Sequence, residues 1–274
     1  MEKANWRLLI TKPSSGAWNM AVDEAILECI SQGLSQPTLR LYAWAPPCLS
    51  LGYSQPYSDI DLARIADRGW DIVRRPTGGR AILHTDELTY STIAPQSEPR
   101  VQGGVLESYQ RLSTALVEAL RLLGLLAQAD KEYDLPEGSN PKGAVCFEIP
   151  SKYEITVDQK KLIGSAQARR KQVVLQHGSI PLSGDLTRIV QVLQYNSDAQ
   201  RLDAAQRLLE RATTIETCLG KDILWEISAQ AVVQGFEDTL NLSFEVLPLN
   251  DFELERVEAL LLKKHANADW IERL

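Results

Sequence analysis

The sequence predicts an α+β fold, with a mixed or antiparallel sheet flanked by helices and a helical C-terminal portion. Over the first two thirds of the chain, short β-prone runs alternate with stretches of helical apolar spacing. After Pro181 the spacing becomes mainly helical. Apolar residues make up 44% of the 274 residues, enough for a substantial hydrophobic core.

The N-terminal half begins with a predicted strand at residues 6–10 and a helix at 17–30, whose apolar residues recur at helical spacing behind a Ser-Ser-Gly capping segment. Two strands are expected on either side of Pro46-Pro47, because proline cannot donate to a sheet ladder. In order, the further elements are strands at 38–44 and 48–53, a short helix at 59–68, strands at 71–75, 80–84 and 87–94, and a long helix at 106–126.

The second half opens with residues 131–142, which are rich in Pro, Gly, Asn and charge and are predicted to form a loop. Asp158-Gln159 then fits a hairpin turn between two strands. We expect residues 1–182 to form the core and 183–274 to pack on it as part of a single domain. The predicted elements are strands at 153–157, 160–164 and 172–180, helices at 186–193, 199–212 and 223–240, a strand at 244–247 and a helix at 251–265.

The charge balance argues against a general nucleic-acid binder. Lys and Arg number 29 against 36 Asp and Glu, a net charge of −7, although residues 141–180 alone carry +4. That basic segment is suited to an acidic partner. The longest apolar stretch is interrupted by Glu118 and Arg121, and the first residues have no secretion signal. We therefore expect a cytoplasmic protein that neither spans a membrane nor binds nucleic acid.

The four cysteines, at positions 29, 48, 146 and 218, lack the spacing of zinc ligands, so no metal is expected. Cys29 lies on the apolar stripe of a helix and Cys48 in a strand, which predicts packing roles for both. Only Cys146 leads into the basic segment. Nearby cations lower the pKa of a thiol from about 8.5, which favours the reactive thiolate. A small buried hydrophobe is the alternative for Cys146.

Several familiar site motifs fail. The segment from Gly138 to Gly143 has the glycine spacing of a phosphate loop, but Ala144 replaces the required lysine. Two segments remain. One is residues 74–84, where paired glycines between strands let backbone N–H groups approach a ligand, unless this is only a turn with solvated arginines. The other comprises residues 143–148, 160–167 and 176–179, in which Gly-Ser-Ala is interpreted as a small-residue turn.

The chain resembles the biotin/lipoate protein ligase and octanoyltransferase superfamily. The resemblance is carried by four runs in this order, RRPTGGRAILH, CFE, KKLIGSAQ and QHGSI, and by NMA followed by Asp23-Glu24 near the start. Within it the chain is most similar to octanoyltransferases of the LipM type. These move an octanoyl group from acyl carrier protein to a lysine of a lipoyl domain, typically the glycine-cleavage H protein. The resemblance covers residues 6–182, implies the catalytic-domain fold of that superfamily, and makes 1–182 the acyltransferase core.

By position, the resemblance makes Cys146 the residue that forms an acyl thioester and Lys161 the lysine that lowers its pKa; on charge alone, Lys160 is an equal candidate. It implies no cofactor. His84 and His177 are candidates for proton transfer or for structural hydrogen bonds, and His265 is expected to be solvated near a helix end. The resemblance places these residues around the acyl and carrier-arm pocket: Arg75, Gly78, Gly79, His84, Gly164, Ser165, Ala166, Gln167 and His177.

Three other functions stay open at this point. ATP-dependent lipoate ligases share the Arg-Arg and Lys-x-x-Gly-Ser-Ala segments, but usually have Gly at the position of Arg80 and an Asn-Asp pair near that of Cys146. Octanoyl amidotransferases, which act between lipoyl domains, also use a cysteine. A non-catalytic carrier-binding or acyl-sensing module is the third. The expected partners are octanoyl-acyl carrier protein as donor and a lipoyl-domain protein as acceptor.

Overall fold

The computed structural model describes residues 1–129 and 154–274. The predicted loop at 131–142, the Cys-Phe-Glu motif and Cys146 itself lie outside the described residues. The predictions for the remaining strands and helices can be compared with the structure directly.

The main sheet has eight strands in the order β11-β1-β2-β6-β10-β9-β8-β7. Strand β1, next to the edge strand β11, is parallel to both of its neighbours, whereas the pairs from β2 to β7 are antiparallel. The prediction of a mixed sheet is thus confirmed. The strands are β1 (Ala4–Ile10), β2 (Thr38–Tyr42), β6 (Glu87–Pro95), β7 (Gln128–Ala129), β8 (Ile155–Val157), β9 (Lys160–Arg170), β10 (Val173–Pro181) and β11 (Leu242–Val246).

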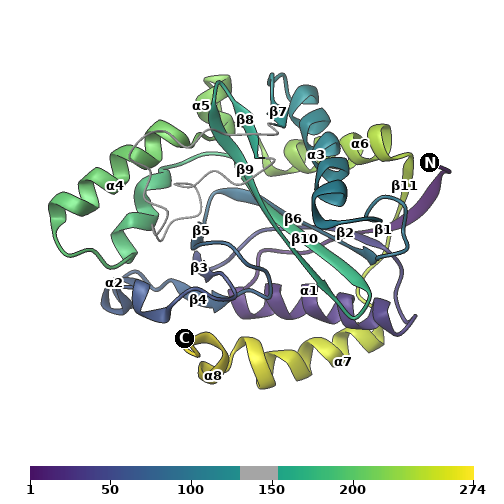
Figure 1. The fold of residues 1–274 in the computed structure, drawn as a ribbon, viewed down its shortest axis with the longest axis horizontal. Helices are drawn as coiled ribbons and strands as arrows, with labels where there is room; N and C mark the ends of the chain where they lie inside the picture. The colour runs from purple at the N-terminus through teal and green to yellow at the C-terminus, as the bar shows by residue number, and fades with distance from the viewer. Residues whose placement is uncertain (130–153) are drawn as a thin grey trace.

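Helices cover both faces of this sheet (Figure 1). On one face lie α1 (Gly16–Ser31) and α7 (Asp251–Leu260), and on the other α3 (Val105–Leu122) and α6 (Trp225–Leu240). The last two pack closely because Gly235 has no side chain; a Cβ there would lie 2.4 Å from the carbonyl oxygen of Ala115. Alternate residues of each strand therefore enter two separate cores.

A smaller three-stranded sheet, in the order β4-β3-β5, lies beside the main one. Its inner face packs with α2 (Leu62–Asp67), the 3-10 helix η3 (Leu186–Val192) and α4 (Asp198–Arg211) in a separate apolar cluster. The loop from Arg75 to Ala81 connects two of its strands. The strands are β3 (Cys48–Leu51), β4 (Asp71–Arg74) and β5 (Ile82–His84).

Local signals in the sequence set most element boundaries. Ser15 caps α1 by accepting a hydrogen bond from the backbone N–H of Trp18. Asp158 and Gln159 have φ of 49° and 63°, values that make the predicted tight hairpin turn. The predicted helix at 106–126 ends early, at Leu122, because Gly124 adopts a φ of +90° just beyond it. The sequence did not predict four short elements, which are η1 (Tyr57–Asp59), α5 (Ile215–Leu219), α8 (Ala268–Ile271) and the two-residue strand β7.

The residues after 182 are built into the same sheet and both helical layers. Strand β11 extends the sheet beside β1, while α6 packs against α3 and α7 against α1. The buried Arg7 of β1 also pairs with the buried Glu253 of α7, 2.5 Å apart. The C-terminal portion is helical apart from β11, and it completes both covers of the sheet.

Candidate functional site

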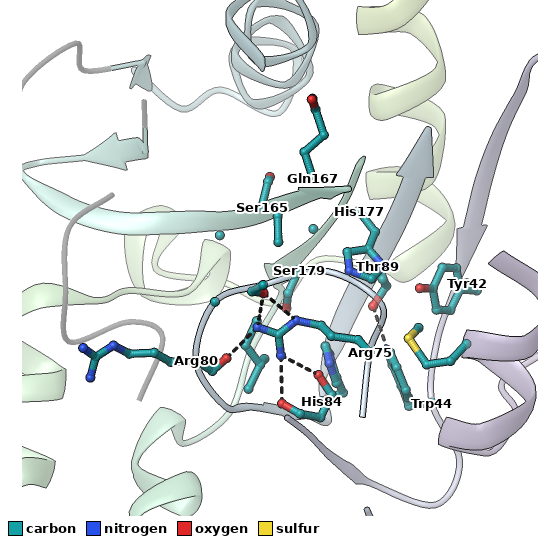
Figure 2. Close-up of a pocket in the computed structure, with 18 of the residues that line it drawn as sticks. Tyr42, Trp44, Arg75, Arg80, His84, Thr89, Ser165, Gln167, His177 and Ser179 are labelled. Carbon is teal, nitrogen blue, oxygen red and sulfur yellow. Dashed lines mark hydrogen bonds between the residues drawn. The ribbon is translucent and has the colours of Figure 1, made fainter. Parts of the chain in front are cut away.

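A pocket of about 330 Å³ opens between the main sheet, the β4–β5 loop and the N-terminal half of α1 (Figure 2). Every residue that the sequence assigned to the site and that the structure describes lies on its wall. These residues are Arg75, Gly78, Gly79, His84, Lys161, Gly164, Ser165, Ala166, Gln167 and His177. The lining also includes residues to which the sequence assigned no role in the pocket: Met20, Tyr42, Trp44, Ser50, Arg80, Ile82, Thr89, Gly178 and Ser179.

The pocket floor is one row of side chains across four strands. Tyr42 of β2 pairs with Thr89 of β6, Thr89 with Ser179 of β10, and Ser179 with Gly164 of β9. Directly paired residues point to the same face of a sheet, so all four positions face the pocket. Gly164 contributes no side chain to this row, which leaves room for a ligand.

The segment Gly164–Gln167 corrects a prediction: it lies in the middle of β9 and is no turn. Ser165 Oγ lies 2.7 Å from the hydroxyl of Tyr90, and Gln167 Nε2 donates to Ser108 of α3. Both side chains therefore point to the opposite face of the sheet, away from His177 and Ser179 (Figure 2). Ser165 and Gln167 line the pocket through their backbone, while Gly164 and Ala166 face it.

Arg75 shapes the β4–β5 loop. Its buried guanidinium donates hydrogen bonds to the carbonyl oxygens of Ser50, Gly78 and Arg80. Gly79 has a φ of +93°, which favours glycine, and a Cβ on Gly52 would lie only 1.8 Å from its carbonyl oxygen. Arg75 thus holds the loop against the small sheet by bonding its backbone.

His177 is fixed from both sides. Its Nδ1 lies 3.3 Å from Asp23 Oδ2, and its Nε2 lies 2.7 Å from the hydroxyl of Thr77. Burial lowers the pKa of His177, although the contact with Asp23 opposes this. A neutral imidazole that donates from Nδ1 to the carboxylate accepts at Nε2, so Thr77 is the donor in the second bond. His177 consequently connects α1, β10 and the β4–β5 loop (residues 75–81), called the glycine loop below.

Asp23 is the centre of this network. It is fully buried and accepts hydrogen bonds from Arg40, Tyr42 and Ser91 as well as from His177. Burial raises the pKa of this carboxyl, but the charge of Arg40 and the bonds from its partners hold the pKa below its ordinary value. Asp23 therefore stays ionised and fixes the orientation of His177.

His84, also on the pocket wall, has a similar arrangement. Its Nδ1 lies 2.8 Å from Glu87 Oε1, and its ring stacks on Trp44 with centroids 3.9 Å apart. Glu87 also accepts from the hydroxyls of Thr89 and Ser179. Burial acts to raise the pKa of Glu87, yet His84 and these donors hold it below its ordinary value. Each pocket histidine is thus oriented by one buried carboxylate.

The structure separates the two lysines that charge alone left equivalent. Lys161 is buried on the pocket wall, and its Nζ lies 2.5 Å from Oε1 of the buried Glu154. Lys160 points elsewhere and donates to the carbonyl oxygen of Leu209. Lys161 is therefore the better placed of the two to act in the pocket.

The three described cysteines lie outside the pocket lining. Cys29 and Cys48 are buried, as predicted, and burial raises the pKa of both thiols, so they stay protonated and unreactive. Cys218 is partly buried, with its Sγ 3.4 Å from the hydroxyl of Thr213. Among the described thiols, none has the setting of a nucleophile.

His265 corrects another prediction. It is completely buried, and its Nε2 lies 2.8 Å from Glu24 Oε2 on α1. Lys264 binds the same carboxylate. The reason is the π-helix η4 (Leu261–His265), which continues α7 and packs its end against α1, so this helix end is not solvated.

Residues 1–129 and 154–274 offer neither a metal site nor a membrane-spanning helix. They contain no group of three or more His, Cys, Asp or Glu side chains arranged to hold a metal ion. No helix in this part of the chain has the length and apolar character to span a membrane.

Sequence reasoning missed the residues that support the pocket histidines. Asp23 was noticed only as part of the resemblance, and Thr77 and Glu87 received no role. One signal was available: Asn19 and Asp23 are polar residues four positions apart, which places them on one face of a helix with a long apolar stripe. Trp44 gave no such signal, since aromatic side chains usually fill a core.

Comparison with known proteins places this geometry in context. A sequence model described as the lipoyl protein ligase A/B catalytic domain matches residues 15–237. A relative from Kyrpidia tusciae named octanoyltransferase LipM is 42% identical over 269 residues, 97% of each chain. The structure of a bi-partite lipoate protein ligase from Thermoplasma acidophilum aligns with a TM-score of 0.82 at 25% identity, covering 99% of this chain and 96% of that one. A lipoate-protein ligase A bound with ATP gives 0.79 at 26% identity, covering both chains fully.

Proposed function

The chain belongs to the family of the lipoyl protein ligase A/B catalytic domain, and from this premise we propose that it is an octanoyltransferase of protein lipoylation. The observation that carries the proposal is the full-length similarity to a protein named octanoyltransferase LipM. The proposed donor is octanoyl-acyl carrier protein. The proposed acceptor is a lysine of a lipoyl domain such as the glycine-cleavage H protein.

The proposed reaction exchanges one thioester for another and then forms an amide. The thiolate of Cys146 attacks the thioester carbonyl of the donor, the new C–S bond forms, and the carrier thiolate leaves and takes up a proton. The neutral amine of the acceptor lysine next attacks the acyl-cysteine carbonyl. It loses a proton as the amide forms, and the Cys146 thiolate is released. The donor is already activated, so neither step consumes a nucleotide.

Lys161 is proposed to stabilise the thiolate and the transition states that follow. Its ammonium group is buried at the pocket wall, where a charge acts more strongly than in water. Each unit by which a cation lowers the pKa of a thiol corresponds to about 1.4 kcal/mol of preference for the thiolate. Glu154 holds this lysine at the pocket wall.

The pocket is suited to an acyl chain. Met20, Tyr42, Trp44 and Ile82 give it an apolar side, and the absence of a side chain at Gly164 leaves depth. Seven carbon groups of an octanoyl chain, at ~0.8 kcal/mol each, contribute roughly 5 kcal/mol when buried. His84, held by Glu87, and His177, through the hydroxyl of Thr77, are proposed to relay the proton released by the acceptor amine.

The test is acylation without ATP. The purified protein is mixed with octanoyl-acyl carrier protein, and its intact mass is measured. We expect a gain of about 126 Da, the mass of an octanoyl group replacing a hydrogen, because the acyl group is held covalently. Cys146→Ala should abolish the gain, whereas the matched variant Cys218→Ala, which changes a thiol outside the pocket lining, should retain it. An adduct of that mass on Cys146→Ala would refute the assignment of the nucleophile.

An ATP-dependent lipoate or octanoate ligase is the second candidate, because the two similar structures described above are lipoate protein ligases and one contains ATP. Modification of a lipoyl domain from free octanoate that occurs only with ATP would support that function instead. An amidotransferase acting between lipoyl domains is separated by the donor: it would use the octanoylated H protein and leave octanoyl-acyl carrier protein unused.

A further inference from the structure

A group of cationic and aromatic side chains lies on the outer side of the glycine loop. We call it the Tyr53 cluster, and it consists of Tyr53, Arg170, Lys264, Trp270 and Arg273. The guanidinium carbons of Arg273 and Arg170 lie 3.9 Å and 5.0 Å from the centroid of the Tyr53 ring. Arg273 and Lys264 each lie 4.1 Å from the Trp270 ring. The two aromatic rings hold three cations close together.

The two arginines of this cluster keep their charge without a carboxylate partner. Neither Arg170 nor Arg273 takes part in an ion pair with the described residues, whereas Lys264 is paired with Glu24. The charge of Arg273 also acts on the buried Arg74. Burial is the larger cause that lowers the pKa of Arg74, and the charge of Arg273 lowers it further. This excess of positive charge is notable in a chain whose net charge is −7.

The cluster is attached to the loop that closes the pocket. Arg170 Nη2 donates to the carbonyl oxygen of Pro76 at 3.1 Å. The backbone N–H of Tyr53 donates to the carbonyl oxygen of Thr77 at 2.8 Å. The following residues, Gly78 and Gly79, line the pocket itself. None of the five cluster residues is among the pocket lining. The cluster and the pocket therefore share one short loop, and the cluster contacts it from outside the pocket lining.

We propose that the Tyr53 cluster is the docking surface for the acidic acyl carrier protein that delivers the acyl group, an inference that rests on the proposed function. A carrier holds its acyl group on a long flexible arm, so its protein body can dock one loop away from the pocket. The acceptor lysine has only its own short side chain and must come to the pocket opening. Planar guanidinium groups also bind carboxylates and phosphates through paired hydrogen bonds, which suits an acidic protein with a phosphate in its arm.

The experiment compares two charge reversals of equal size. Arg273→Glu changes the cluster, and Lys221→Glu changes an exposed lysine between α5 and α6. Two quantities are measured at low salt for each variant: the dissociation constant for the acidic carrier protein, and the rate of acyl-enzyme formation. The rate is measured with octanoyl-carrier and with octanoyl-pantetheine, a neutral thioester without the protein and the phosphate. Thermal unfolding checks the fold, and Arg273→Gln replaces Arg273→Glu if the latter does not fold.

We expect Arg273→Glu to weaken carrier binding and to slow acylation by the carrier about tenfold, because opposite charges steer and hold the encounter. The rate with octanoyl-pantetheine and all rates of Lys221→Glu should stay within about twofold of the original chain. The proposal is overturned if Arg273→Glu slows both donors equally, leaves carrier binding unchanged, or acts no more strongly than Lys221→Glu. It is also overturned if binding of a lipoyl domain weakens more than binding of the carrier. Carrier binding that depends on Arg273, without acylation from either donor, would keep the docking surface and reject the proposed function.

Discussion

The two faces of the main sheet are built from the same strands and differ in what they bury. Toward α3 and α6, residues such as Leu41, Leu88 and Tyr90 form a continuous apolar core. Toward α1, the alternate positions of the same strands carry Arg40, Thr89, Ser91 and His177, all of them buried polar groups. The pocket lies on this second face.

On the α1 face, buried polar side chains around the pocket replace part of the apolar packing. A buried polar group costs free energy unless it is hydrogen-bonded, and on the α1 face Asp23 and Glu87 supply those bonds. The α3 face, called here the apolar face, resists unfolding mainly through packing, whereas the α1 face, called here the polar face, combines its own apolar core with charged partners around the pocket. Substitutions on the two faces should therefore have different consequences.

The largest loss of stability is expected from Phe236→Ala on the apolar face. Phe236 of α6 is fully buried, with its ring centroid 6.5 Å from that of Tyr90. Removing the ring leaves a cavity and should lower the free energy of unfolding by about 3–5 kcal/mol, measured by chemical denaturation. The rate of acyl-enzyme formation by the folded fraction should not change. Leu224→Ala, at an exposed position before the same helix, is the control and should have little effect.

Asp23→Asn on the polar face should cost somewhat less stability, about 3 kcal/mol, because Arg40 is left buried without its counter-charge. It should also change the site. Asp23 raises the pKa of His177 against the effect of burial, so the variant should show a still lower His177 pKa by NMR titration. Asp67→Asn, on exposed α2, should change neither quantity. An unchanged His177 pKa in Asp23→Asn would contradict the assigned pairing.

Glu24→Gln is expected to have a smaller, pH-dependent effect at the edge of the polar face. Burial raises the pKa of Glu24, but His265 and Lys264 lower it to about 2. A carboxyl whose pKa is depressed by folding adds stability above its ordinary pKa of 4.5 and loses it as the pH falls toward 2.

At pH 7 the variant should therefore be less stable by about 1–2 kcal/mol, and the two proteins should become equally stable near pH 2. Urea denaturation at several pH values measures this, with the exposed Glu258→Gln as the matched control. A stability difference that stays constant from pH 7 to pH 2 would show that the Glu24 charge is not involved.

The sequence predicted the framework because periodicity and turn residues are local. Ser15 begins α1, Asp158 and Gln159 form the hairpin, and the glycine loop falls between two strands as expected. Motif spacing also identified pocket residues, since the resemblance marked segments that the fold brings together from the β4–β5 loop, β5, β9 and β10.

The remaining features depend on contacts between residues far apart in the chain. The bond from Thr77 to His177 joins positions a hundred residues apart, and that from His265 to Glu24 spans 241. No local pattern reveals such partners. Gly-Ser-Ala was interpreted as a turn because small residues are common in turns, yet here they lie in a strand where the pocket needs space. The opposite orientations of Ser165 and Ala166 follow only once that strand is recognised.

The central claim, that the pocket on the α1 face holds the acyl chain, is tested most directly by Ala166→Leu. Ala166 pairs with His177 and faces the pocket, so a leucine there should fill acyl space without disturbing the apolar face. The rate of acyl-enzyme formation is measured with octanoyl and acetyl donors on the same carrier. We predict that the octanoyl rate falls more than about tenfold while the acetyl rate is unchanged, because only the longer chain needs the lost volume. Equal loss with both donors, or octanoyl acylation at the original rate, would contradict the account.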